Sequence, residues 1–182
     1  MTPHLLPIID ENENIIGVES RANIHKNGLL HREIDVWLFT PKAELIFQHR
    51  SKTKDTYPDM LDASASGHVE IGSNFEDAAL AELEEETGIK TTLDNLIFLK
   101  KIRENSFDRV TGMTNNSIRA VYAYRFDGSI SELKIEEGMG LGFEIWPIEK
   151  VMFGTDEEKA RIIPAILNEQ MLECFRIIQK LL

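Results

Sequence analysis

Gly67-His68-Val69-Glu70-Ile71-Gly72-Ser73 opens the stretch of sequence that decides the fold, and Ala81-Glu82-Leu83-Glu84-Glu85-Glu86-Thr87-Gly88-Ile89 closes it. Between the two runs, Phe75, Ala79 and Leu83 fall four residues apart, which places them on one face of a helix. Ser73 with Glu76 has the form of a capping box, and a glycine at position 88 suits the left-handed residue that ends a helix. We therefore predict a loop, a helix from about residue 73 to 88, and a second loop.

This stretch contains many acidic residues and no lysine or arginine. Between Lys54 and Lys90 the acids are Asp55, Asp59, Asp62, Glu70, Glu76, Asp77, Glu82, Glu84, Glu85 and Glu86. Like charges three or four residues apart on a helix cost roughly 0.2–0.5 kcal/mol per pair, and the negative end of the helix dipole adds to this cost. Glu82, Glu85 and Glu86 lie within about one turn, so a hard cation such as Mg²⁺ or Mn²⁺ would balance them. The alternative is a solvated acidic face.

Length and composition predict one globular domain over residues 1–182. Hydrophobic residues make up 42% and charged residues 28% of the chain, as in ordinary globular proteins. The 31 acidic and 20 basic residues give a formal charge of -11, which argues against binding to nucleic acid or to an anionic membrane. A single cysteine, Cys174, excludes an intrachain disulfide, and no signal peptide or long apolar run is found. We expect a cytoplasmic protein that acts on a small molecule.

The rest of the chain predicts an α/β (α+β) fold. We expect a hairpin of two short strands first, then two paired strands, two further strands separated by a polar loop, and a C-terminal amphipathic helix. The predicted ranges are 5–9 and 15–18, 34–40 and 45–50, 96–102 and 118–126 with a loop over 103–116, and a helix over about 164–182. The final helix either covers the domain core or forms a homodimer contact.

The acidic stretch resembles the Nudix box, G-x5-E-x7-R-E-U-x-E-E-x-G-U, in which U is a bulky aliphatic residue. The match runs over residues 67–89 and includes Gly67, Glu82, Leu83, Glu85, Glu86, Gly88 and Ile89. Two positions depart from the pattern, because Ser73 replaces a glutamate and Ala81 replaces an arginine. One negative and one positive group are lost together, which suggests the loss of an ionic support and leaves the three helix glutamates in place.

Other segments extend the resemblance over about residues 5–150, toward the Nudix branch that also contains isopentenyl diphosphate isomerases. They include Pro7 to Asn12, Leu29 to Arg32, Gln48 to Ser51 and Lys54 to Pro58. The resemblance implies the Nudix fold, with a mixed β-sheet sandwiched between helices, and a metal-dependent hydrolase that cleaves a diphosphate linkage in a nucleoside diphosphate derivative or similar metabolite. It also implies that the box lies beside the diphosphate site.

The resemblance assigns metal ligation to the Gly67 carbonyl and to Glu82, Glu85 and Glu86. Glu85 is a ligand or a group that positions the attacking water. Glu137, with Glu136 as its rival, is the candidate for a further catalytic carboxylate, because the segment 136–147 looks like the acidic, glycine-containing segment that precedes a tryptophan strand in the family. For contact with the substrate we nominate Arg50, Lys52 and Lys54, since a diphosphate carries more charge than one metal ion neutralises.

Two other functions stay open. An isomerase of this branch carries a catalytic cysteine directly before the Gly-His pair, where this chain has Ser66, and the spacing of Cys174 suits a core residue. A Nudix-fold module that binds a metabolite without turning it over is favoured by Ser73 and Ala81, whereas the retained glutamates favour the hydrolase. We expect His31 and His68 to be structural, because no nucleophile is paired with them.

Overall fold

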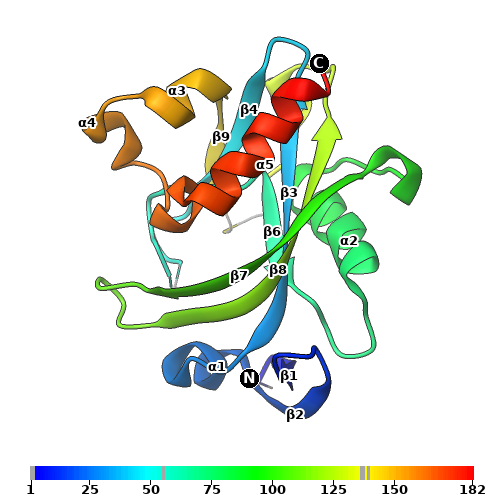
Figure 1. Cartoon of the computed structure of the whole chain (residues 1–182), viewed down its shortest axis with the longest axis vertical. Coiled ribbons are helices and arrows are strands. Elements are labelled where there is room, and N and C mark those ends of the chain that lie inside the picture. The colour runs from blue at the N-terminus through cyan, green and yellow to red at the C-terminus, as the bar shows by residue number, and fades with distance from the viewer. Residues whose placement is uncertain (1–2, 55, 136–137, 139) are drawn as a thin grey trace.

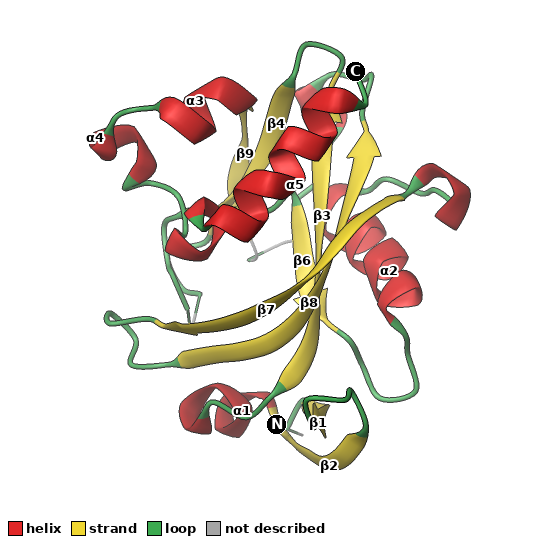
Figure 2. Ribbon diagram, in the orientation of Figure 1, coloured by secondary structure: helices red, strands yellow, loops and turns green. Residues whose placement is uncertain are grey.

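The computed structural model describes residues 3–54, 56–135, 138 and 140–182. It has a seven-stranded mixed sheet between helices and a separate two-stranded sheet near the N-terminus (Figures 1 and 2), which confirms the predicted fold class. The strands are β1 (Leu5–Ile9), β2 (Ile15–Ser20), β3 (His31–Thr40), β4 (Glu44–Arg50), β5 (Leu61–Asp62), β6 (Ala65–His68), β7 (Ile97–Phe107), β8 (Thr114–Arg125) and β9 (Gly140–Pro147). The helices are α1 (Arg21–Asn27), α2 (Phe75–Thr87), α3 (Ile148–Phe153), α4 (Asp156–Lys159) and α5 (Glu169–Lys180), with 3-10 turns at Leu93–Asn95, Ile130–Glu132 and Pro164–Leu167. None of the described helices is both long and apolar enough to span a lipid bilayer.

The central strand of the large sheet is β3. It pairs in parallel with β8 along its length, and on its other side it pairs antiparallel with β6 in its first half and with β4 in its second half. The remaining neighbours, β5 and β9 beside β4 and β7 beside β8, are also antiparallel. The predicted pairings of residues 5–9 with 15–18 and of 34–40 with 45–50 are confirmed.

Helices α2 and α5 cover opposite faces of the sheet, as Figure 1 shows. Side chains alternate between the two faces of a strand, so Val36 and Leu38 pack with α2, whereas Trp37 and Phe39 pack with α5. Each face therefore has its own hydrophobic core, and the helix with the acidic residues is fixed to one of them.

Helix α2 follows the prediction except at its first turn. The cap is Asn74, whose side-chain oxygen accepts a hydrogen bond from the Asp77 N–H at 2.8 Å, so the predicted cap at Ser73 is wrong by one residue. Gly88 ends the helix with a φ of 75° as predicted, and its N–H donates to the Glu84 carbonyl. Phe75 and Leu83 are buried on the face that contacts the sheet.

Two predicted ranges differ from the structure. The expected loop over 103–116 is mostly strand, because β7 extends to Phe107 and β8 starts at Thr114, and only a short turn around Asp108 connects them. Polar residues in these strands face inward, which concealed the strand pattern. The expected helix over 164–182 is a 3-10 turn followed by α5, whose N-cap Asn168 accepts from the Met171 N–H at 2.9 Å. The buried side of α5 covers the domain core, which is the first of the two roles predicted for the C-terminal helix.

Candidate functional site

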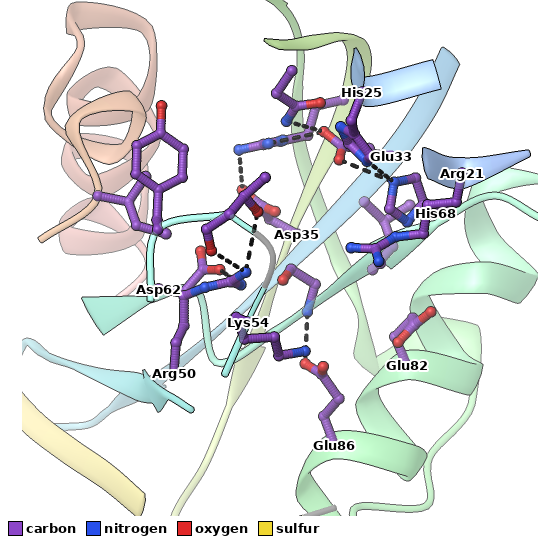
Figure 3. A pocket seen from close by; sticks show the side chains of 18 of the residues that line it. Arg21, His25, Glu33, Asp35, Arg50, Lys54, Asp62, His68, Glu82 and Glu86 are labelled. Atoms are coloured by element: carbon purple, nitrogen blue, oxygen red, sulfur yellow. Dashed lines mark hydrogen bonds and ion pairs between the residues drawn. The ribbon is translucent and has the colours of Figure 1, made fainter. Parts of the chain in front are cut away.

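One face of the sheet changes from apolar to polar along its strands. On β3, Trp37 and Phe39 point to the same face as Asp35, Glu33 and His31, because they are separated by even numbers of residues. The same change occurs on β8, from Val121 and Ala123 to Arg119 and Ser117. Helix α5 covers the apolar half. The polar half forms part of the wall of a cavity of about 490 Å³, whose main residues are drawn in Figure 3.

Helix α2 contributes two glutamates to this cavity, and the end of β6 contributes a glycine. A Cβ atom on Gly67 would lie 2.0 Å from Glu82 Oε1, so the absence of a side chain lets this carboxylate lie directly against the backbone. Glu86 Oε2 accepts hydrogen bonds from the Ser66 N–H at 3.0 Å and from Gln48 Nε2 at 3.3 Å. Gly67, Glu82 and Glu86 thus bring oxygen donors of the kind that Mg²⁺ and Mn²⁺ prefer to one wall.

Glu86 is a buried carboxylate, with 3% of its surface exposed. Burial raises its pKa to about 7, while the hydrogen bond from the Ser66 N–H and the positive charges of Lys54 and Arg50 oppose the shift. A buried carboxylate is costly unless a partner compensates its charge. A positive charge beside Glu86 would therefore stabilise its ionised form.

The nominated cations lie in different surroundings. Arg50 and Lys54 line the cavity, and Lys54 extends toward Glu86 in Figure 3. Arg50 Nη1 pairs with Asp62 Oδ2 at 2.6 Å, and its Nη2 donates to the Thr56 carbonyl at 2.9 Å. Burial, and then the charge of Arg50, lowers the pKa of Lys54. The Lys52 side chain is 71% exposed and lies 3.7 Å from Asp59, outside the cavity lining.

One nominated carboxylate that the structure describes, Glu85, does not line the cavity. Glu85 is exposed. It follows Leu83 by two positions, or about 200° around the helix, whereas Glu86 follows Leu83 by three and shares its side. Glu136 and Glu137 lie outside the described residues.

The cavity also contains a network of buried charges that the sequence analysis did not identify. Glu33 Oε2 accepts hydrogen bonds from Asn115 Nδ2 at 2.8 Å, Ser117 Oγ at 2.7 Å and Arg119 Nη2 at 2.9 Å. Asp35 Oδ2 accepts one, from Arg119 Nη1 at 3.2 Å. These residues occupy inward positions of β3 and β8. The sequence feature that could have predicted them is a charged residue at an even spacing from Trp37, which places it on the same face of the strand.

The two carboxylates of this network differ in pKa, and they also differ in the number of hydrogen bonds that they accept. Burial opposes the ionisation of both. At Glu33 the Arg119 guanidinium and His31 overcome this effect and hold the pKa well below its usual range. At Asp35 burial prevails over Arg119 and, together with the nearby carboxylates Asp62, Glu33 and Glu104, raises the pKa to about 7.

Three histidines meet beside Glu33. His25 of α1, His31 of β3 and His68 of β6 bring one donor atom each to within 4.8 Å of one another. His25 Nε2 lies 3.0 Å from His68 Nε2, and Glu33 Oε1 lies 3.6 Å from Nε2 of both His31 and His68. His31 Nδ1 lies 3.0 Å from the Leu29 carbonyl, which can only accept, so Nδ1 carries a proton and Nε2 is the ring atom beside Glu33.

This cluster could hold a metal ion with nitrogen ligands. Burial, and then the nearby His31, Arg21 and His25, lowers the pKa of His68 well below its usual value in spite of Glu33, so its ring is neutral as a ligand requires. The sequence analysis treated His31 and His68 as structural and overlooked His25. The three positions belong to separate elements, and the pairing of Glu33 with His68 across β3 and β6 is visible only in the fold.

The amino-acid sequence matches a known protein family and several of its members. A model described as the NUDIX domain matches residues 29–166. The chain is 39% identical over 107 residues to an uncharacterized Nudix hydrolase of Clostridium acetobutylicum, a match that covers 57% of this chain and 52% of that protein. It is 33% identical over 124 residues to isopentenyl-diphosphate delta-isomerase 2 of Photorhabdus laumondii, covering 68% of this chain and 66% of the isomerase. The chain thus spans about half to two thirds of the length of these relatives.

A solved structure has a similar fold. The crystal structure of DR0079 from Deinococcus radiodurans superposes with a TM-score of 0.66 over 95% of this chain and 98% of the other, at 21% sequence identity. At this identity the likeness concerns the fold alone.

Proposed function

The chain belongs to the NUDIX domain family, and from this premise we propose that it is a metal-dependent hydrolase that cleaves a diphosphate linkage in a nucleoside diphosphate derivative or a similar small metabolite. The observation that carries the proposal is the convergence of Gly67, Glu82 and Glu86 on a cavity that also contains Arg50 and Lys54. Oxygen donors for a divalent cation and side chains that attract phosphate thus meet in one place.

In the proposed site the Gly67 carbonyl, Glu82 and Glu86 hold Mg²⁺ or Mn²⁺. When bound there, the ion would supply a positive charge that lowers the repulsion between the phosphate oxygens and the attacking water. The Ser66 N–H and Gln48 keep the Glu86 carboxylate in place, and the missing side chain at Gly67 gives Glu82 its position. Lys54 and Arg50 face the same space and reduce the negative charge that remains on the diphosphate. Glu85 and Glu137 remain candidates for positioning the water.

A second position for a divalent ion is the cluster of His25, His31 and His68. Imidazole donors favour Zn²⁺ or a later transition-metal ion such as Ni²⁺, whereas the carboxylates of α2 favour Mg²⁺ or Mn²⁺. Elemental analysis of the purified protein, compared with the metal dependence of its activity, distinguishes the two positions. A tightly bound metal that is lost in His68→Ala and kept in Glu86→Gln belongs to the histidines.

The isomerase is the second candidate function, because some relatives of the chain are named as isomerases. Ser66 stands where that chemistry has a thiol, and its N–H donates to Glu86. Cys174 is buried on the core-facing side of α5 among apolar side chains. The described residues therefore offer no accessible thiol for the proton transfer, and the hydrolase is the better account.

The hydrolase proposal is tested by measuring phosphate and monophosphate release from diphosphate compounds in the presence of Mg²⁺ or Mn²⁺. Glu86→Gln keeps shape and volume but removes a ligand charge, so we expect activity to fall by orders of magnitude while the fold persists. Glu84→Gln is the matched control, since Glu84 is on the same helix and pairs with Lys90 on the surface. Binding of a compound without release from any of them would instead favour the binding module.

A further inference from the structure

Asp35 is a buried carboxylate that lines the cavity and has no assigned role. Only 1% of its surface is exposed, and in Figure 3 it lies between Glu33 and Asp62. Glu33 and Asp35 share one guanidinium, that of Arg119, so this part of the network has two carboxyl groups for one permanent positive charge. Buried charges are ordinarily compensated, and an excess of one sign in a cavity points to a group that arrives from outside.

The hydrogen bonds of Asp35 are incomplete. Its Oδ2 accepts from Arg119, whereas its Oδ1 accepts no hydrogen bond from the part of the chain that the structure describes. Two neighbouring acids of the cavity differ in this respect. Glu33 has three donors on Oε2, and Asp62 accepts from Arg50 on one oxygen and from the Ala63 N–H on the other. Glu33 Oε1 accepts no hydrogen bond but lies 3.6 Å from Nε2 of both His31 and His68. Among these three acids, Asp35 is therefore the one with an oxygen that has neither a hydrogen bond nor an ion-pair contact to the described residues.

The fold places Asp35 next to the proposed reaction centre. It is paired across the antiparallel β3–β6 ladder with Ser66, whose N–H donates to Glu86. Directly opposed residues put their side chains on the same face about 5 Å apart. A ligand whose diphosphate contacts the metal at Glu86 can thus reach Asp35 with the group attached to it.

We propose that Asp35 determines substrate specificity, by accepting a hydrogen bond from a hydroxyl of the group attached to the diphosphate. This inference rests on the proposed function. A hydroxyl suits the position because an ammonium would lie close to the Arg119 guanidinium, which already contacts Asp35. An alkyl group would displace water from Asp35 and leave its oxygen without a donor, and sites that lose a hydrogen bond in this way discriminate strongly against such a ligand.

The remaining cavity surface agrees with a polar ligand. Ile34, Ile163 and Ala165 are the aliphatic side chains among the described residues that line it, and the others are mostly charged or polar. An alkyl tail would find few aliphatic side chains to pack against, although carbon atoms of the polar side chains also face the cavity. The selection against alkyl diphosphates is thus expected to come from Asp35 and its surroundings together.

The test compares ADP-ribose, which carries sugar hydroxyls beside the diphosphate, with isopentenyl diphosphate, which carries an alkyl group. Hydrolysis rates with Mg²⁺ and calorimetric binding are measured for the wild type, Asp35→Asn and Asp35→Ala. We expect Asp35→Ala to lower kcat/KM for ADP-ribose at least about tenfold, mainly through KM, without lowering the response to isopentenyl diphosphate. Asp35→Asn keeps an acceptor oxygen and should lose less. Asp127→Ala, in an exposed pair with Arg125, is the control.

Several outcomes overturn the inference. An equal loss for both probes in Asp35→Ala and Asp35→Asn means that Asp35 only supports the structure, and unchanged discrimination means that it does not contact the ligand. A wild-type protein that binds both probes equally, or neither, also contradicts it. If the wild type hydrolyses neither probe but binds ADP-ribose more tightly than isopentenyl diphosphate in an Asp35-dependent manner, the proposed hydrolase fails while the specificity role stands.

Discussion

The apolar and polar halves of one sheet face have different roles, although the same strands form both. In the apolar half, Trp37 packs edge-to-face against Phe47 and Phe175, with ring centroids 5.2 and 4.8 Å apart. In the polar half, Glu33 and Asp35 compete for Arg119. Apolar packing stabilises a fold strongly. In a buried ion pair, the attraction between the charges offsets little more than the free energy lost by removing them from water. We infer that stability comes from the half beneath α5, and that the other half is retained for what it binds.

The largest expected effect is on stability, and it comes from breaking the apolar half. Phe175→Ala removes a fully buried ring between α5 and the sheet, so we expect the free energy of unfolding to fall by about 3–5 kcal/mol. Chemical denaturation measures it. Phe153→Ala, at a ring that is 77% exposed, is the control and should change stability by less than about 0.5 kcal/mol. Equal losses in the two variants would contradict the division between the halves.

The next effect is on metal binding and leaves most of the stability unchanged. In Gly67→Ala the new methyl group would overlap Glu82 Oε1, and the flexible carboxylate must move away. We expect metal affinity to fall about tenfold to a hundredfold, as when a group that orients a ligand is lost. Titration calorimetry with Mn²⁺ measures it. Gly17→Ala, whose Cβ would lie 3.8 Å from the nearest Ile8 atom, is the control. A Gly67→Ala protein with normal affinity would argue against metal binding at Glu82.

A smaller effect has the opposite sign and depends on pH. The pKa of Asp35 is raised to about 7 in the folded protein from 3.8, so the folded state holds its proton more tightly than the unfolded state. Between these values the wild type loses stability as the pH rises. We expect Asp35→Asn, which cannot ionise, to be more stable at pH 8 by on the order of 1–3 kcal/mol, with the gain disappearing near pH 4.

Thermal unfolding of Asp35→Asn and the wild type across this pH range checks the prediction. Other groups that titrate, such as Glu86, are present in both proteins and cancel in the difference. A gain that is the same at pH 4 and pH 8 would mean that the ionisation of Asp35 is not its cause. Asp127→Asn, at an exposed carboxylate, should show no trend with pH.

The smallest effect concerns the two departures from the box. Ser73 and Ala81 are not among the described residues that line the cavity, so Ser73→Glu with Ala81→Arg should leave hydrolysis unchanged or raise it slightly. The introduced arginine would lie four residues from both Asp77 and Glu85, and each such pair stabilises a helix by about 0.2–0.5 kcal/mol. Steady-state hydrolysis rates and melting temperatures of the double variant and the wild type measure these two effects. A large gain in rate would show that the missing arginine supports the reaction centre directly.

The sequence predicted the parts of the molecule that follow local rules. The spacing of Phe75, Ala79 and Leu83 determines the buried face of α2, and the resemblance to the box correctly indicated the family. The direction of Glu85 could have been derived from the same spacing, because it lies far around the helix from Leu83. What the box could not indicate is how far each carboxylate is from the cavity.

The polar half of the sheet face was harder to predict for a physical reason. Strand prediction depends on apolar residues at every second position. Ser106 and Arg119 interrupt this pattern because they line the cavity, and Glu104 and Ser117 interrupt it as buried polar residues of the same strands. Residues 103–116 were consequently interpreted as a loop. The histidine cluster depends on the register of β3 with β6 and on the docking of α1, which are tertiary features that no local spacing specifies.

The separate β1–β2 hairpin and the helix that follows it have a practical consequence for how the protein is cut or compared. The family match begins at residue 29, yet His4, Arg21 and His25 precede it and line the cavity. Ion pairs of Arg103 with Glu11 and of Lys101 with Glu13 tie the hairpin to β7. A fragment trimmed to the family boundary would keep the whole box and lose part of the cavity wall. Homologues with a different N-terminal segment can therefore share this box and accept different ligands.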